Sequence, residues 1–177
     1  VSGKDVAEAI LKKLEVEIKR KKLRPKLAII LAGDNPSSRI YINNKIKTAQ
    51  RIDIKVVLYE FSQDQQDKCL QTIQKLNKDR SVNGIIVQYP VYDGWNFDDF
   101  TLKINPQKDV DGFLKDSPYS GATALAVWEM QTAFSYLSGF SKTEDFLKDK
   151  NIVVLGKGKA AGGPITKLLE NKRFEII

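Results

Sequence analysis

Short apolar runs predict three buried strands in the first half of the chain. They cover residues 27–33, 55–61 and 83–90, and each is followed by turn-forming or polar residues. Apolar runs of this length are typical of strands that are buried on both faces of a sheet. A fourth run over 151–158 ends in glycine, and 173–177 begins a further predicted strand.

Helical spacing of apolar residues fills the segments between these strands. In 62–79 the residues Cys69, Ile73 and Leu76 recur every three or four positions, so we expect this helix to turn them inward. The turn-forming residues 34–38 precede another helix. The other predicted helices are 4–21, a short stretch at 96–104, a long buried helix over 122–137, and 162–172 with Pro164 in its first turn.

The alternation of strands with helices predicts an α/β fold with a mainly parallel sheet. We expect a three-layer α/β domain over 1–120, a linking helix and connection over 121–150, and the beginning of a Rossmann-like domain over 151–177. A doubly wound domain needs roughly five or six strands, so we expect it to continue beyond Ile177. Val1 in place of a methionine also suggests a fragment or a processed start.

Composition narrows the chemistry that this chain can perform. It contains no histidine and one cysteine, Cys69, which excludes Ser-His-Asp catalysis, histidine-based metal sites and an intramolecular disulfide within the chain. No metal site is expected, and proton transfer must use Lys, Asp, Glu, Tyr or Cys. No apolar run approaches the roughly 18–20 residues that span a bilayer, and no secretory signal is visible. We therefore expect a cytoplasmic protein without a membrane partner.

The chain carries a net charge of +7. Much of this charge lies in residues 12–26, KKLEVEIKRKKLRPK, where a solvated helix face is the simplest interpretation. Basic proteins often bind nucleic acid, but no nucleic-acid motif is present. Nucleic acid is therefore not the expected partner, and a basic nucleic-acid-binding α/β domain stays the last-ranked alternative.

One candidate constellation follows the first strand. Ser38, Tyr41 and Lys45 are spaced so that they share a helix face near the carboxyl edge of the sheet, where α/β proteins bind ligands. A lysine in such a cleft can be desolvated and can then carry protons. The alternative from spacing alone is an ordinary exposed helix surface.

Two further groups lie at the same predicted edge. Gln88, followed by Tyr89 and Pro90, ends the third strand, and its amide could orient a water or a substrate oxygen or could satisfy the loop backbone. In Lys108-Asp-Val-Asp-Gly112 we expect one carboxylate to bind a ligand and the other to cap a turn at Gly112, rather than a catalytic pair.

A glycine-rich segment joins the fourth strand to the last helix. Its sequence, GKGKAAGGP over 156–164, can direct backbone N–H groups and a helix N-terminus toward a phosphate. The spacing departs from Gly-x-Gly-x-x-Gly, because the third glycine falls four positions after Gly158. The acidic residue that would bind the ribose is expected after Ile177, so the choice between NAD and NADP stays open.

Taken together, four segments resemble the methylenetetrahydrofolate dehydrogenase/cyclohydrolase family. They are AGDNPSSRIYINNKIK, GIIVQYP, INPQKDVDGF and VVLGKGKAAGGPITKLL, in the family's order and spanning nearly the whole chain. The resemblance implies a folate-binding catalytic domain followed by an NAD(P)-binding domain. It also implies oxidation of 5,10-methylenetetrahydrofolate with NADP (NAD possible), hydrolysis to 10-formyltetrahydrofolate, and a homodimer.

The resemblance also assigns roles to residues. Lys45 matches the catalytic lysine, Gln88 the residue that holds it, and Asp111 the carboxylate that binds the pterin edge. Substrate-binding residues would be Tyr41, which packs against the folate, with Ser38, Tyr89 and Pro90. The implied cofactor-binding residues are Gly156, Lys157, Gly158, Lys159, Gly162, Pro164 and Thr123.

Several positions depart from the family pattern. Gly156-Lys157-Gly158 replaces the usual Gly-Arg-Ser, which could weaken a 2′-phosphate contact. The family's Cys-Thr-Pro is Ala122-Thr123-Ala124, and its Leu-Pro-Leu-Pro is residues 89–92, Tyr-Pro-Val-Tyr. Because the family's C-terminal cleft-closing segment is absent, a non-catalytic remnant that binds folate or a protein partner is the second alternative.

Overall fold

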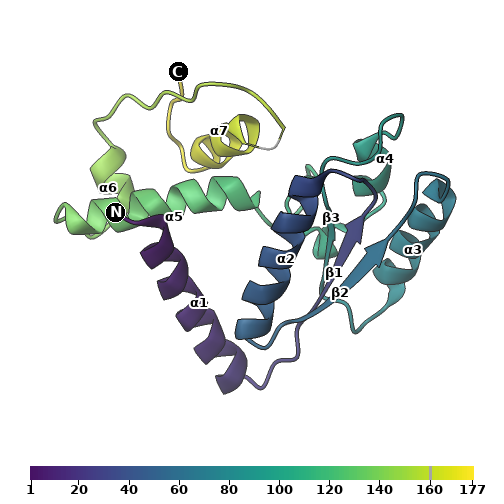
Figure 1. Cartoon of the computed structure of the whole chain (residues 1–177). Helices are drawn as coiled ribbons and strands as arrows, with labels where there is room; N and C mark the ends of the chain where they lie inside the picture. Colours follow the sequence, from purple (N-terminus) through teal and green to yellow (C-terminus); the bar gives the residue numbers. More distant parts are fainter. Residues whose placement is uncertain (160) are drawn as a thin grey trace. The chain divides into compact units, whose positions relative to one another are not determined.

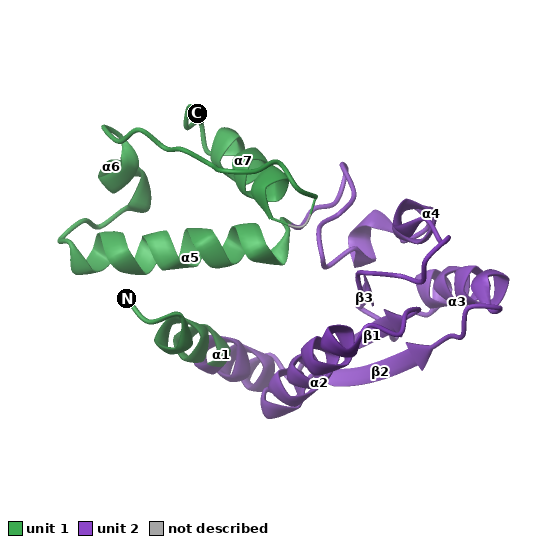
Figure 2. Cartoon of the chain, turned by 45° about the horizontal axis from the view of Figure 1, so that its top comes forward, with its two compact units in different colours: residues 1–11, 120–177 green, residues 12–119 purple. Residues whose placement is uncertain are grey.

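The computed structural model describes residues 1–159 and 161–177. Ala160, which belongs to the glycine-rich segment singled out above, lies outside the described residues. The chain divides into two compact units, one of residues 12–119 and the other of residues 1–11 with 120–177 (Figures 1 and 2). Helix α1 (Gly3–Arg20) therefore begins in one unit and ends in the other.

The unit of residues 12–119 is built on a three-stranded parallel sheet. Its strands are β1 (Lys26–Leu31), β2 (Lys55–Glu60) and β3 (Gly84–Val87), in the order β2-β1-β3. Ile29 of the central strand pairs with Leu58 on one side and Ile86 on the other. The three predicted strands are confirmed, although β3 ends three residues before Pro90, because proline has no N–H to donate to a ladder.

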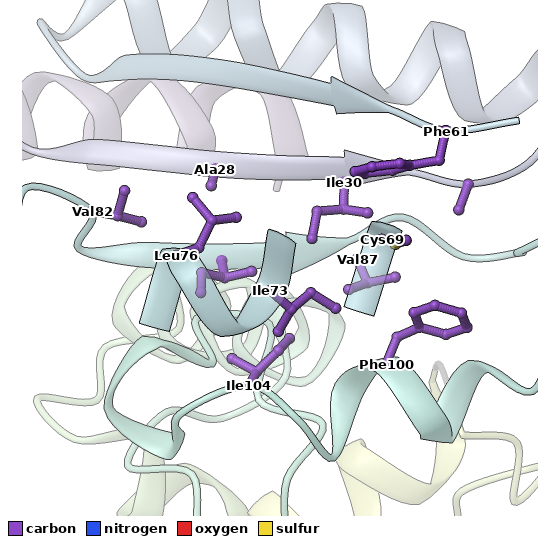
Figure 3. Close-up of a cluster of buried hydrophobic side chains, with 12 residues drawn as sticks. Ala28, Ile30, Phe61, Cys69, Ile73, Leu76, Val82, Val87, Phe100 and Ile104 are labelled. Atoms are coloured by element: carbon purple, nitrogen blue, oxygen red, sulfur yellow. The ribbon is translucent and has the colours of Figure 1, made fainter. Parts of the chain in front are cut away.

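Helices cover both faces of this sheet. Helix α2 (Pro36–Arg51) buries Ile42 with Ile29, Leu31 and Ile86 on one face. On the other face α3 (Gln66–Lys78) and α4 (Phe97–Thr101) pack against Ala28 and Ile30 (Figure 3). Cys69, Ile73 and Leu76 lie in this second cluster, as their spacing predicts, and the expected three-layer α/β arrangement is confirmed.

Asparagine side chains start the elements that carry the site. The Asn35 side chain accepts a hydrogen bond from the Ser37 N–H, and Pro36 occupies the first position of α2. Asn96 caps α4 in the same way, and Asn105 caps the short 3-10 helix η1 (Pro106–Lys108). These caps set where each helix begins relative to the strand before it.

In the described part of the second unit, three helices follow residue 120. They are α5 (Ala122–Leu137), α6 (Thr143–Leu147) and α7 (Gly162–Asn171). The predicted bounds of α5 are confirmed, and α7 ends one residue before its predicted end. However, α5 is not a buried helix in this chain, since Leu125, Phe134, Tyr136 and Leu137 are exposed. Its sequence is apolar on all sides, and the described part of the unit covers only some of that surface.

The strands predicted over 151–158 and 173–177 do not form as strands. Only an isolated parallel bridge between Ile152 and Ile176 is present there. Val153 and Leu155 are 56% and 92% exposed. Two paired segments alone are marginally stable at best, and the described residues after 120 contain no further strand to pair with them. Within the described residues, no helix is both long and apolar enough to cross a lipid bilayer.

Candidate active site

The structure brings Lys45 of α2 to Gln88, one residue beyond β3. The Lys45 ammonium donates a hydrogen bond of 3.1 Å to the Gln88 side-chain oxygen. Gln88 is 9% exposed, and its amide nitrogen donates at 2.8 Å to the Tyr89 carbonyl. The second bond fixes which end of the amide faces the lysine, so the oxygen is held toward Lys45.

Ser38 lies in the first turn of α2 and is 2% exposed. Within the described residues its hydroxyl has no hydrogen-bond partner. A buried hydroxyl without a partner costs about 1–3 kcal/mol, so this side chain calls for a bound water or a ligand atom. Tyr41, by contrast, is 62% exposed and presents its ring to solvent.

The two carboxylates of the Lys108–Gly112 segment have different surroundings. Asp109 is 1% exposed, its carboxylate accepts the Leu114 N–H at 2.8 Å, and its carbonyl accepts the Gly112 N–H. It is thus the residue that caps the turn. This segment runs beside β3 through an Ile85–Asp109 bridge, with Val110 packed over Gly84, where a Cβ atom would come within 2.7 Å of the valine.

Asp111 is not used in this way and lies within the electrostatic reach of Lys45. Burial raises the pKa of the Asp111 carboxyl, the Lys45 charge lowers it, and the nearby Asp109 raises it further. A partly buried carboxylate opposite a cation is suited to accept hydrogen bonds from the N–H groups of a ligand.

Three aromatic rings pack in a row that begins at Tyr89, the residue after Gln88. Tyr89 is 58% exposed and packs edge to face on Phe97 at 5.2 Å, and Phe97 packs in the same way on Phe113 at 5.1 Å. The Tyr89–Pro90 peptide is cis, and a Cβ atom on Gly33 would come within 2.8 Å of the Pro90 carbonyl oxygen. Sequence reasoning missed Phe97 and Phe113. Phe113 directly follows the Asp-Val-Asp-Gly motif, which could have indicated it.

The other predicted residues belong to the second unit. Gly156 has a φ of 97°, and a side chain on Gly162 would collide with the Gly156 carbonyl oxygen. Gly158 accepts the Gly163 N–H, Pro164 lies in the first turn of α7, and Lys157, Lys159 and Thr123 are exposed. Among the described residues, no side chain caps the N-terminus of α7. A tight glycine turn leading into an uncapped helix N-terminus fits the phosphate group of a nucleotide.

As a chemical site, the residues of the first unit combine a cation, a held amide, a partly buried carboxylate, an unpartnered hydroxyl and exposed aromatic rings. This set can bind a flat, hydrogen-bonding heterocycle and can carry a proton to or from it. It contains no thiol or histidine that could act as a nucleophile at this place.

Comparison with known proteins agrees with this description. The family model "Tetrahydrofolate dehydrogenase/cyclohydrolase, catalytic domain" matches residues 1–111. The bifunctional protein FolD of Caldanaerobacter subterraneus subsp. tengcongensis is 33% identical over 176 residues, which cover 99% of this chain and 63% of that relative.

Two solved structures have the same fold. The FolD methylenetetrahydrofolate dehydrogenase/cyclohydrolase of Campylobacter jejuni aligns with a TM-score of 0.86 and 30% identity, over 99% of this chain and 64% of that one. The Trypanosoma brucei enzyme, solved with NADP cofactor and inhibitor, aligns with a TM-score of 0.84 and 28% identity, over 100% and 62% of the two chains. The chain thus spans just under two thirds of the length of these relatives. The matched model covers the strands, helices and loops that carry Ser38, Lys45, Gln88 and Asp111, and the chain belongs to the tetrahydrofolate dehydrogenase/cyclohydrolase family.

Proposed function

We propose that this chain carries the folate site of a methylenetetrahydrofolate dehydrogenase/cyclohydrolase of one-carbon metabolism. The activities would be oxidation of 5,10-methylenetetrahydrofolate with NADP⁺, or NAD⁺, and hydrolysis of the resulting methenyl cation to 10-formyltetrahydrofolate. The observation that carries the proposal is the Lys45–Gln88 hydrogen bond of 3.1 Å, with Asp111 within the field of the same ammonium group.

The hydrolysis needs a positioned water and a proton carrier. The methenyl carbon is already electrophilic, so water adds to it, loses a proton, and one carbon–nitrogen bond then breaks as that nitrogen takes up a proton. Lys45 is the group within this site that can carry the proton. Gln88 holds the ammonium group in place because its own amide is tied to the Tyr89 carbonyl.

Substrate binding would use the remaining residues of the site. Asp111 would accept hydrogen bonds from the N–H groups along the pterin edge. The Ser38 hydroxyl, which has no partner among the described residues, would gain one from the ligand. Tyr41, Tyr89 and Pro90 would border the aromatic parts of the folate. Phe97 packs against Tyr89, and Phe113 in turn packs against Phe97.

Cofactor binding would fall to Gly156, Lys157, Gly158, Lys159, Gly162 and Pro164, with Thr123. The cofactor supplies the hydride acceptor of the oxidation. The glycine positions bring backbone N–H groups and the start of α7 toward a phosphate, and the two lysines would attract its charge. NADP was bound in the Trypanosoma brucei relative, and we extend that cofactor to this chain. We also expect a homodimer that acts in the cytoplasm, as in the family.

The test is 5,10-methylenetetrahydrofolate-dependent reduction of NADP⁺ and NAD⁺, together with hydrolysis of 5,10-methenyltetrahydrofolate, by the chain and its Lys45→Ala variant. We expect turnover that is lost in the variant. Turnover that survives Lys45→Ala would remove the lysine from its assigned role. Tight folate binding without turnover would instead establish a non-catalytic binding chain.

A further inference from the structure

The net charge of the chain is concentrated in three turns. These are the turns that lead into the strands, over residues 20–26, 51–55 and 78–81. Together they contain nine basic and two acidic residues, a net charge of +7, which equals the net charge of the whole chain. The rest of the chain carries twenty basic and twenty acidic residues and is therefore neutral overall.

Sheet topology brings the three turns together. The strands are parallel and adjacent, and their first residues are in register, with Lys26 beside Lys55 and Leu27 beside Gly84. Neighbouring strands lie about 4.8 Å apart, so the three turns fall within roughly 10 Å of one another. Figure 1 traces the chain from the ends of α1 and α2 into the starts of β1 and β2. We call this end of the sheet, formed by the three turns, the basic edge.

The basic edge is rich in arginine rather than in lysine. Four of the six arginines of the chain lie in it, but only five of the twenty-three lysines. All four arginines, which are Arg20, Arg24, Arg51 and Arg80, are exposed. The planar guanidinium group binds phosphate with two parallel hydrogen bonds, which an ammonium group does not. Enrichment in arginine therefore points to phosphate.

Helix capping and ion pairing account for only part of this charge. Arg20, Arg51 and Lys78 complement the dipoles of the helices that they end, but Arg24, Lys55 and Arg80 lie beyond the helix ends. Of the nine basic residues, Lys21 pairs with Glu17 and Lys26 with Asp79. No ion pair among the described residues involves Arg24, Lys55 or Arg80.

Lys22 occupies a position that usually belongs to glycine. Its φ is 52°, and the Leu23 N–H returns to the Ile18 carbonyl at 3.0 Å, which closes the end of α1. Glycine adopts this left-handed conformation without strain and is the common residue there. The chain keeps a lysine in spite of that cost, and this places one more exposed cation on the basic edge.

The side chains around these cations indicate what they would bind. The three turns contain no aromatic residue that could stack on a base, and their one exposed large apolar side chain is Leu23. Without aromatic residues, the three turns cannot recognise bases by stacking. With one exposed apolar side chain, they have little to insert into a lipid layer. We propose that the basic edge binds the phosphate backbone of nucleic acid without sequence preference, at the end of the sheet opposite the Lys45 site.

The test is fluorescence anisotropy of a labelled 20-base-pair DNA duplex and of a 20-nucleotide RNA, titrated with the chain at several salt concentrations. We expect binding whose log K falls with log salt at a slope of about −3 to −5, since each duplex phosphate contact contributes about −0.9. The Arg24→Glu/Arg80→Glu variant should bind at least tenfold more weakly. Arg24→Lys/Arg80→Lys, which keeps the charge, should show a smaller loss.

A matched control separates this edge from net charge alone. Lys68→Glu/Lys103→Glu lowers the charge by the same amount, but Lys68 lies at the start of α3 and Lys103 follows α4, outside the three turns. We expect its binding within twofold of wild type, with unchanged thermal unfolding for all variants. Equal losses in both charge-reversed variants, binding that salt does not weaken, or binding to phosphatidylserine vesicles but not to nucleic acid would overturn the proposal.

Discussion

At the residue scale, Gln88 shows how one buried amide can orient a charged neighbour. Its nitrogen is committed to the Tyr89 carbonyl at 2.8 Å, which leaves only its oxygen for Lys45. If Lys45 carries the proton in the proposed hydrolysis, Gln88 determines where that ammonium group lies. Its contribution is therefore positional rather than chemical.

Replacing Gln88 tests this directly. Gln88→Ala removes the acceptor, and we expect hydrolysis of methenyltetrahydrofolate to slow by about 10²-fold, the usual cost of misplacing a catalytic group. Gln88→Glu places a carboxylate against Lys45, which should shift the pH–rate profile of hydrolysis to higher pH. Gln63→Ala is the control, because Gln63 is exposed and donates to the Asp93 carbonyl, away from Lys45. A normal rate in Gln88→Ala would contradict the positioning role.

Asp111 predicts a dependence of stability on pH. Burial raises the pKa of its carboxyl in the folded chain. The folded state then holds the proton more tightly than the unfolded state. Protonated Asp111 therefore contributes fully to the free energy of unfolding below the pKa of the unfolded state, near 3.9. This contribution is lost as pH rises through the pKa of the folded state. Above that range, burial of the Asp111 carboxyl therefore lowers the free energy of unfolding.

Asp111→Asn should relieve that cost. We expect a higher Tm at pH 7, by about 2–4 °C for each kcal/mol relieved, and little gain near pH 3.5, where wild-type Asp111 is itself protonated. Folate binding should weaken in the same variant. Differential scanning calorimetry across pH checks the first expectation. A gain in Tm that is the same at both pH values would show that burial of this charge is not its cause.

At the element scale, the end of α3 is secured by a side chain from a distant segment. The Lys108 ammonium donates to the carbonyls of Leu76 and Asp79, each at 2.7 Å. Leu76 lies in the last turn of α3 and Asp79 is its C-cap, where backbone carbonyls lack helical partners. The same bonds tie the loop of Asp109 and Asp111 to the end of α3, so a helix cap also positions the site.

Lys108→Met should keep the aliphatic stem and remove both bonds. We expect a loss of about 1–3 kcal/mol in the free energy of unfolding, as for other hydrogen bonds from a charged group. Urea unfolding with an unchanged m-value would measure it. Lys103→Met is the matched control, since Lys103 is exposed and outside this cap. Equal stability of the two variants would mean that the cap contributes nothing.

Elements differed in how well the sequence predicted them. Periodicity located α3 with its inward Cys69 and Ile73. It succeeded because this helix packs one face on the sheet, so its apolar residues recur every three or four positions. It failed for residues 151–158, whose apolar run was interpreted as a strand although only the Ile152–Ile176 bridge forms. An apolar run reports what could be buried, whereas a strand requires a neighbour to pair with.

The site was predictable to a smaller extent. The resemblance indicated Lys45 and Gln88, and the structure places them in contact, although 43 residues separate them. Phe97 could not be found in this way. Its role depends on an edge-to-face contact with Tyr89 across a loop, and no local spacing records such a contact. The sequence showed the basic run over 12–26, but not that the sheet places the basic residues of 51–55 and 78–81 beside it.

At the scale of the whole molecule, the residues proposed to bind folate and those proposed to bind the cofactor belong to different units. The folate residues fall within 12–119 and the cofactor residues within the unit of 1–11 and 120–177. Hydrogen exchange with mass spectrometry should therefore show two separate footprints. Tetrahydrofolate should slow exchange in 34–45, 87–90 and 109–114, and NADP⁺ in the segments around Gly156 and Gly162. Protection of the same peptides by both ligands would contradict this division of residues.

The single cysteine gives the chain a built-in reporter. Cys69 is fully buried between α3 and the sheet, and burial raises the pKa of its thiol to about 12. Thiolate is the reactive form, so a disulfide reagent should modify the native chain only when α3 separates from the sheet. The rate of modification would then measure how often that core opens. A second cysteine introduced on the surface could therefore be labelled selectively, because buried Cys69 does not react in the native chain.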